Sequence, residues 1–139
     1  MATDLKELIR QYVEQVWNLG NPAALDQLTT PSFTYLLAGQ PGRDRAGMQQ
    51  FIKMTHVAFP DWRVQIVDII AEGSSVVIRW QGRVTHQGVF QGILPTGKQI
   101  TVSGINIYRI AGDKISAEWE QTDSLAMLQQ LGVLPRPGA

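Results

Sequence analysis

The chain has 139 residues, and its twelve Lys and Arg residues balance twelve Asp and Glu residues, so the formal net charge is zero. This balance argues against a general nucleic-acid-binding protein, which needs clustered and unopposed cations. The sequence has no cysteine and only two histidines, which excludes disulfide scaffolds, thiolate metal sites, cysteine nucleophiles and sites built from three histidines. The 44% hydrophobic content is typical of a globular protein, and we expect one domain over residues 1–139.

The sequence also indicates where the protein acts. No apolar run approaches the roughly 18 residues that cross a bilayer, so we expect no membrane contact. The start, MATDLKELIRQ, is acidic and helical in pattern, whereas a secretory signal is basic and then apolar. We therefore expect a cytoplasmic protein. Its carboxylates are scattered along the chain, which predicts that it has no metal centre.

The first part of the chain has a helical pattern. Apolar residues recur at a spacing of three and four from Leu5 to Trp17, which predicts a helix over residues 4–19. Asp4 is suited to cap its start and Gly20 to end it. The pattern then predicts three shorter elements: a helix starting at Pro22, a strand over 33–38 and a helix over 44–58.

From Trp62 onward the hydrophobic period is two, which is typical of strands. The predicted strands cover 62–70, 75–90, 99–110 and 114–122, and a last helix covers 123–131. Helices followed by an antiparallel meander predict an α+β fold, in which the N-terminal helices cover the concave face of a curved sheet. Such a cone encloses a hollow that can hold a small ligand.

Strand alternation predicts which side chains share that hollow. A two-residue turn at 112–113 pairs Asn106 with Trp119, and a three-residue loop at 95–97 places His86 opposite Asn106. The resulting inner face carries both aromatic and polar side chains, which is typical of a pocket. Its members are Trp80, His86, Asn106, Trp119, Gln121 and Asp123. A one-residue bulge would move half of this set to the other face.

The opposite face of the predicted sheet mixes charged and apolar side chains. Arg79 and Glu118 lie there beside Ile105 and Ile107. Such a surface is typical of a subunit contact, so we expect a homo-oligomer, either a dimer or a tetramer.

Several segments resemble the SnoaL-like polyketide cyclases of the nuclear transport factor 2-like superfamily. They are FPDWRV (59–64), HQGVFQGILPTGK (86–98), INIYRIAGDKI (105–115), Glu118-Trp119 and LAMLQQLG (125–132). The resemblance implies a cystatin-like cone and cofactor-free intramolecular aldol closure of a polyketide ester. It also implies that Asp123, at the end of the last strand, is the acid–base residue. Glu118 stands where many relatives have His, and we expect it to affect the surface or substrate preference.

Each candidate acid–base residue has a structural alternative. Asp123 can act as the base if Trp119 and Leu125 desolvate it, or it can cap the final helix, which would make it a poor base. His86 can shuttle a proton because its ordinary pKa is near neutrality, or it can be a hydrogen-bonded sheet residue without a role.

The candidate substrate-binding residues have alternatives as well. Asn106 and Gln121 can donate hydrogen bonds to an enolate oxygen, or they can be ordinary polar strand positions. Trp80, Trp119 and Tyr12 can stack on an aromatic polyketide, or they can fill the core.

The sequence thus favours an enzyme that takes a hydrophobic or aromatic small molecule and closes a ring in it. Three other functions stay open. The first is a non-catalytic protein that binds such a molecule. The second is an isomerase, dehydratase or hydrolase, because this fold supports several proton-transfer reactions. The third is a dimerisation module whose hollow is filled by side chains.

Overall fold

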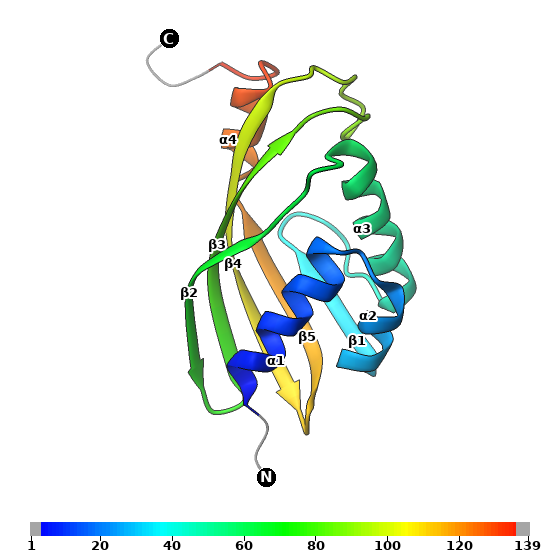
Figure 1. Ribbon diagram of the computed structural model, residues 1–139, viewed down its shortest axis with the longest axis vertical. Coiled ribbons are helices and arrows are strands. Elements are labelled where there is room, and N and C mark those ends of the chain that lie inside the picture. Colours follow the sequence, from blue (N-terminus) through cyan, green and yellow to red (C-terminus); the bar gives the residue numbers. More distant parts are fainter. Residues whose placement is uncertain (1–3, 136–139) are drawn as a thin grey trace.

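The computed structural model describes residues 4–135, and its first part is helical (Figure 1). The helix predicted over 4–19 is confirmed, although its second half is π-helical. Asp4 caps its start, because its Oδ1 accepts hydrogen bonds from the amides of Lys6 and Glu7 at 3.1 and 3.2 Å. The segments are α1 (Leu5–Tyr12), η1 (Val13–Asn18) and α2 (Pro22–Leu28), which begins at the predicted proline.

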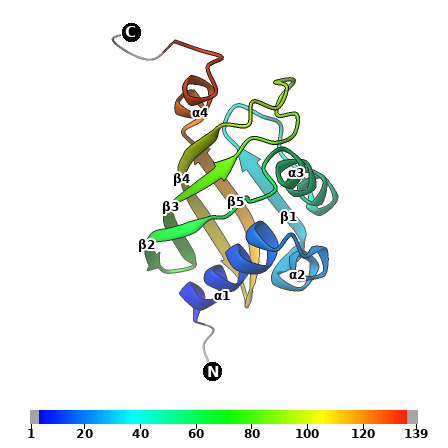
Figure 2. The same cartoon turned by 45° about the horizontal axis from the view of Figure 1, so that its top comes forward.

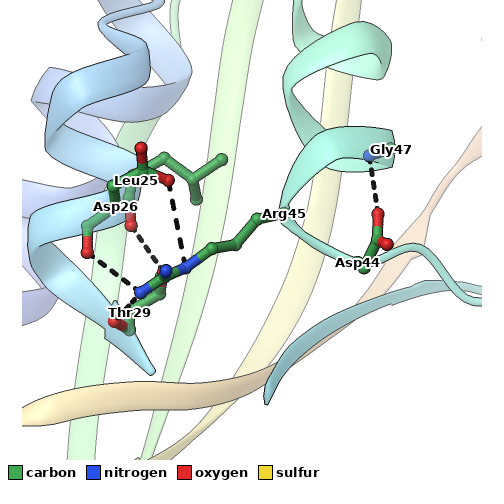
Figure 3. Close-up of polar contacts among 6 residues, drawn as sticks. All are labelled: Leu25, Asp26, Thr29, Asp44, Arg45 and Gly47. Atoms are coloured by element: carbon green, nitrogen blue, oxygen red, sulfur yellow. Dashed lines mark hydrogen bonds and ion pairs between the residues drawn. The ribbon is translucent and has the colours of Figure 1, made fainter. Parts of the chain in front are cut away.

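Strand β1 (Thr29–Leu37) and helix α3 (Arg45–Ala58) follow. Hydrogen bonds from Arg45 connect the start of α3 to the start of β1 (Figure 3). The Nε of Arg45 donates to Thr29 Oγ1 at 2.9 Å, and its Nη2 donates to the carbonyl of Asp26 at 3.0 Å. The start of α3 is capped by Asp44, whose Oδ1 accepts from the amide of Gly47 at 2.9 Å. The first turn of α3 is therefore tied to the junction between α2 and β1.

The remaining chain forms the sheet and a last helix. Its elements are β2 (Gln65–Glu72), β3 (Ser75–Thr85), β4 (Gln99–Ala111), β5 (Lys114–Thr122) and α4 (Ser124–Gln130). The strand order is β1-β5-β4-β3-β2, with β1 and β5 parallel and the other neighbours antiparallel. Figures 1 and 2 show α1, α2 and α3 on one face of the curved sheet, which confirms the predicted α+β class. No helix between residues 4 and 135 is long and apolar enough to cross a bilayer.

The connection between β3 and β4 differs from the prediction. The strands pair Thr85 with Gln99 and Ile78 with Asn106, so the prediction that His86 lies opposite Asn106 is wrong. The whole segment 86–98 forms the loop instead of a three-residue turn. It is held against the end of α3, because the amides of residues 87 and 88 donate to the carbonyl of Ala58 at 2.9 and 3.1 Å.

The hairpin of β4 and β5 contains a bulge that reverses part of the predicted inner face. The turn pairs Ile110 with Ile115 as predicted, but Arg109 pairs with Ala117. Ser116 is the extra residue, and its hydroxyl donates to the carbonyl of Arg109 at 3.1 Å. Beyond this bulge every residue of β5 faces the side opposite to that predicted. The pairing of Asn106 with Trp119 is therefore wrong, and Asn106 pairs with Glu120.

The core lies between the concave face of the sheet and the helices, and it is mainly aliphatic and aromatic. Its largest fully buried side chains include Tyr12, Tyr35, Tyr108, Phe33, Phe59, Leu25, Met48, Ile78 and Ile100. Five polar or ionisable side chains are also buried: Thr29, His86, Asn106, Glu118 and Glu120. Burial of a carboxyl group costs free energy unless hydrogen bonds compensate for the lost water. The buried carboxyl groups of the two glutamates therefore need hydrogen-bond donors around them.

Candidate active site

Two carboxyl groups lie together on the inner face of β5. Glu118 and Glu120 are separated by one residue, so they point to the same side of the strand, and both are buried. Asn106 on β4 lies beside them. Its Nδ2 donates to Glu118 Oε2 at 2.8 Å and to Glu120 Oε1 at 3.2 Å. One amide group thus bridges the two acids.

The helical layer supplies further donors to Glu118. The hydroxyl of Tyr12 donates to its Oε1 at 2.6 Å, and the indole Nε1 of Trp17 donates to its Oε2 at 3.0 Å. Tyr12 ends α1, and Trp17 lies five positions later in η1. Hydrogen bonds in π-helical turns span five residues, so this local geometry places both donors over the same carboxyl group.

Glu120 receives its other hydrogen bonds from the sheet. The hydroxyl of Tyr35 on β1 donates to its Oε1 at 2.9 Å, and the hydroxyl of Thr122 donates to its Oε2. The parallel pairing of β1 with β5 brings Tyr35 next to the strand that carries both glutamates.

Burial dominates the acid–base behaviour of the pair. Loss of water, followed by the negative charge of Glu120, raises the pKa of Glu118 to about 7, although the hydrogen bond from Tyr12 opposes this shift. Burial also raises the pKa of Glu120, against the hydrogen bonds that it accepts. A carboxyl group that titrates near neutral pH can both take up and release a proton, as general acid–base catalysis requires.

The hollow beside the pair is nearly filled by aromatic side chains. A cavity of about 10 Å³ lies there, which is room for about one water molecule. Its lining consists of Val13, Trp17, Trp62, Val64, Ile78, Trp80, Asn106, Tyr108 and Glu120. The roomy chamber expected from the cone shape is therefore not present at this site. A larger ligand enters this cavity only if some of these side chains move.

Three of the predicted site residues meet in this interior. Trp80 Nε1 donates to Asn106 Oδ1 at 2.8 Å, so both residues share the inner face as predicted. Tyr12 joins them through Glu118. The placement of these three residues agrees with the sequence prediction, and their substrate-binding role stays a prediction.

Three other predicted residues lie outside because of the bulge at Ser116. Asp123 is exposed, and its Oδ1 caps α4 by accepting a hydrogen bond from the amide of Ala126 at 3.0 Å. Gln121 is exposed as well. Trp119 lies under the guanidinium of Arg109 on the outer face. The predicted desolvated position of Asp123 is wrong, and the alternative of a helix cap is the one observed.

His86 lies inside the fold but at the end of β3. It is fully buried between the rings of Phe59 and Phe90, at centroid distances of 5.6 and 6.5 Å. Its Nδ1 accepts a hydrogen bond from the amide of Thr96 at 3.2 Å. The structure therefore holds His86 at the start of the 86–98 loop, away from the strand position that faces Asn106.

The sequence interpretation missed the two glutamates. Regular strand alternation predicts Glu118 on the outer face, and it does not single out Glu120. The signal that could have found them is the spacing Glu-Trp-Glu, because acids two residues apart share one face of a strand. Between residues 4 and 135, no group of three or more histidine or carboxylate side chains is arranged to hold a metal ion.

Comparisons with known proteins agree with this architecture. Among solved structures, a candidate polyketide cyclase from Acidithiobacillus ferrooxidans is 34% identical with a TM-score of 0.83, over 95% of this chain and 96% of that chain. IdmH from Streptomyces antibioticus, also a candidate polyketide cyclase, is 30% identical with a TM-score of 0.82, over 94% and 99% of the two chains. AclR from Streptomyces galilaeus, a candidate hydroxylase, is 26% identical with a TM-score of 0.84, over 96% and 83%.

No curated protein matches this chain. The profile of one family, described as SnoaL-like polyketide cyclase, matches residues 7–131. This range contains every helix and strand from η1 to α4, and most of α1. The resemblance found in the sequence is thereby confirmed, and the chain belongs to the SnoaL-like polyketide cyclase family.

Proposed function

We propose that this protein closes a ring in a polyketide-like small molecule by an intramolecular aldol reaction, with Glu118 and Glu120 as its acid–base pair. Family membership supports the reaction class. The observation that carries the proposal is the buried pair of carboxyl groups bridged by Asn106. We assign the acid–base role to this pair rather than to Asp123, because an exposed carboxylate bound to its own helix lacks the desolvation that a base needs.

Glu120 is the better candidate for direct contact with the substrate, because it lines the interior cavity. Glu118 is held by three donors and is fully buried. The negative charge of Glu120 raises the pKa of Glu118. Two carboxylates this close do not both ionise easily, so the pair keeps one proton near neutral pH. Glu118 then holds that proton, and it acts as a positioning residue that leaves Glu120 ionised as the base.

The reaction balances with these groups alone. The ionised carboxylate takes the proton from a carbon between two carbonyls, and the C–H electron pair becomes an enolate. The enolate carbon attacks an internal carbonyl and forms the new C–C bond, which leaves an alkoxide on the former carbonyl oxygen. The alkoxide then takes the proton back from the carboxyl group. Enclosing both reacting carbons in one site supplies the orientation that the step needs.

Substrate entry requires the interior to open. Trp62, which lines the cavity, packs on Phe59 at a centroid distance of 5.8 Å, and Phe59 packs on Phe90 at 5.1 Å. These aromatic rings connect the cavity to the loop 86–98. We propose that displacement of this loop with Phe90 opens a route by which a hydrophobic substrate reaches the cavity.

A comparison of Glu120→Gln with Asp123→Asn tests the assignment. We expect Glu120→Gln to lower kcat for cyclisation of a polyketide ester by at least about 100-fold, since it removes the base. Asp123→Asn should keep nearly full activity, because asparagine also caps helices. Product formation by both variants is measured by liquid chromatography and mass spectrometry, with circular dichroism as the control for folding.

Two results would contradict the proposal. If Asp123→Asn loses activity and Glu120→Gln keeps it, the catalytic role belongs to Asp123. If the wild-type protein quenches its tryptophan emission on binding such esters but never converts them, the protein is a non-catalytic binder. Conversion of unsaturated ketones without ring closure would instead indicate an isomerase.

A further inference from the structure

The hydrogen-bond network around the two glutamates engages every side-chain acceptor that belongs to it. All four carboxylate oxygens of Glu118 and Glu120 already accept at least one hydrogen bond. The side-chain oxygen of Asn106 accepts from the indole of Trp80. These acceptors are therefore already bonded to other donors.

Two further donors do lie in this interior. The indole Nε1 of Trp62 and the hydroxyl of Tyr108 are buried, and neither has a hydrogen-bond partner among residues 4–135. Both side chains line the cavity of about 10 Å³. An indole N–H can only donate, and a buried donor without an acceptor is unfavourable. The cavity is therefore lined by two donors without an acceptor, which indicates a guest with an acceptor oxygen.

We infer that the indole N–H of Trp62 and the hydroxyl of Tyr108 form a binding site for one oxygen atom. In the free protein that atom is a water oxygen. During the reaction it is the substrate oxygen that becomes negative when the enolate forms. This second assignment rests on the proposed function, whereas the water site does not.

The charges in the cavity suit this role. Glu120 lines the same cavity as Trp62 and Tyr108, so the group that takes the proton and the donors that face the developing charge are neighbours. Glu120 becomes neutral when it takes the proton, and it then does not repel the enolate. Donors that the protein itself leaves unbonded need no rearrangement before they stabilise such an oxygen.

The three buried tyrosines of the interior provide a matched comparison. Tyr12 and Tyr35 donate to the glutamates at 2.6 and 2.9 Å, whereas the hydroxyl of Tyr108 makes no such hydrogen bond, although it lies close enough to Glu118 to lower the pKa of that carboxyl group. Loss of the hydroxyl in Tyr108→Phe should leave the melting temperature unchanged or higher. Tyr12→Phe should lower it, because a buried carboxyl group then loses a donor.

The first test is a crystal structure of the wild-type protein at a resolution that shows bound water. We expect one buried water within about 3.2 Å of both Trp62 Nε1 and Tyr108 Oη, and we expect Tyr108→Phe to lose or displace it. A dry cavity, or a water that contacts neither group, would overturn the inference. This outcome is independent of any enzymatic activity.

The second test measures the binding of substituted phenols of increasing acidity by isothermal titration calorimetry. These probes present an aromatic ring and an oxygen with growing negative charge. We expect the affinity of the wild-type protein to rise with phenol acidity. Trp62→Phe and Tyr108→Phe should each bind the most acidic phenol about tenfold more weakly.

Failure of this inference can be distinguished from failure of the proposed function. If Tyr108→Phe binds the phenols as tightly as the wild-type protein, or if the wild-type protein binds none of them, the assignment of a substrate oxygen to this site is wrong even where Glu120→Gln abolishes cyclisation. If the phenols bind as expected but no ester is cyclised, the oxygen site is supported and the cyclase function fails.

Discussion

Glu118 and Glu120 show how burial changes the behaviour of an ordinary acid. In water both would be ionised at pH 7, but inside this fold each faces the other across a shared amide. The spacing of the two residues was visible in the sequence. Their burial was not, because it depends on the bulge at Ser116 and on donors that come from α1, η1 and β1.

The raised pKa of Glu118 predicts how stability changes with pH. Because its pKa rises from 4.5 to about 7 on folding, the folded protein binds more protons than the unfolded chain between these values. The free energy of unfolding should therefore fall as the pH rises from about 4.5 to 7, by up to about 3 kcal/mol. Urea denaturation at pH 5 and pH 8 measures this difference.

The matched variant for this prediction is Glu118→Gln. It keeps the shape of the side chain, and the hydroxyl of Tyr12 can turn to accept a hydrogen bond from the new amide. We expect this variant to lose most of the difference between pH 5 and pH 8, whereas Asp123→Asn, at an exposed position, should retain it. An unchanged pH dependence in Glu118→Gln would show that other groups cause it.

The elements themselves were largely predictable, because local patterns determine them. Asp4 and Pro22 mark helix starts in the sequence and in the structure. The pairing of strands is not local. The turn at 112–113 was identified and Ile110 pairs with Ile115 as predicted, yet the next pair is shifted. The alternation of Ile115, Ala117 and Trp119 favours a regular strand. It therefore gives no sign of the bulge, and it is the bulge that turns the two glutamates toward the inner face.

The loop 86–98 depends on a close contact that only glycine allows. A Cβ on Gly88 would lie 2.1 Å from the carbonyl oxygen of Val57. We expect Gly88→Ala to separate the loop from α3, to lower stability by about 1–3 kcal/mol and to speed amide hydrogen exchange across residues 86–98. Gly42→Ala is the control, because its nearest neighbour, a Leu36 methyl, is at 3.5 Å. Equal exchange rates in the two variants would refute this role for Gly88.

At the scale of the whole molecule, the outer face of the sheet carries an apolar row across four strands. Strand pairing aligns its members, which are partly exposed: Ile70, Val77, Ile107 and Trp119. Ile105 adds to it, with 47% of its surface exposed. A contiguous apolar surface of this kind favours contact with another protein, and the homo-oligomer expected from the sequence stays a prediction.

The apolar row predicts that two copies pack sheet against sheet. We expect Ile107→Glu to convert the oligomer to a monomer, because it places a charge at the centre of that contact. Light scattering coupled to size-exclusion chromatography measures the mass of each species. Met54→Glu, at an exposed position on α3, should leave the mass unchanged. A wild-type protein that runs as a monomer at high concentration would contradict the prediction.

The nearly filled interior has a kinetic consequence. A site with room for about one water molecule cannot capture a polyketide by simple collision, so the open conformation must form before or during encounter. The apparent affinity for the ligand is then lower than the affinity of the open conformation, because only the open fraction of the molecules can bind. The association rate should level off at the rate of opening once ligand is abundant. In this protein, the packing of aromatic rings would then govern turnover as much as the acidity of the carboxyl groups.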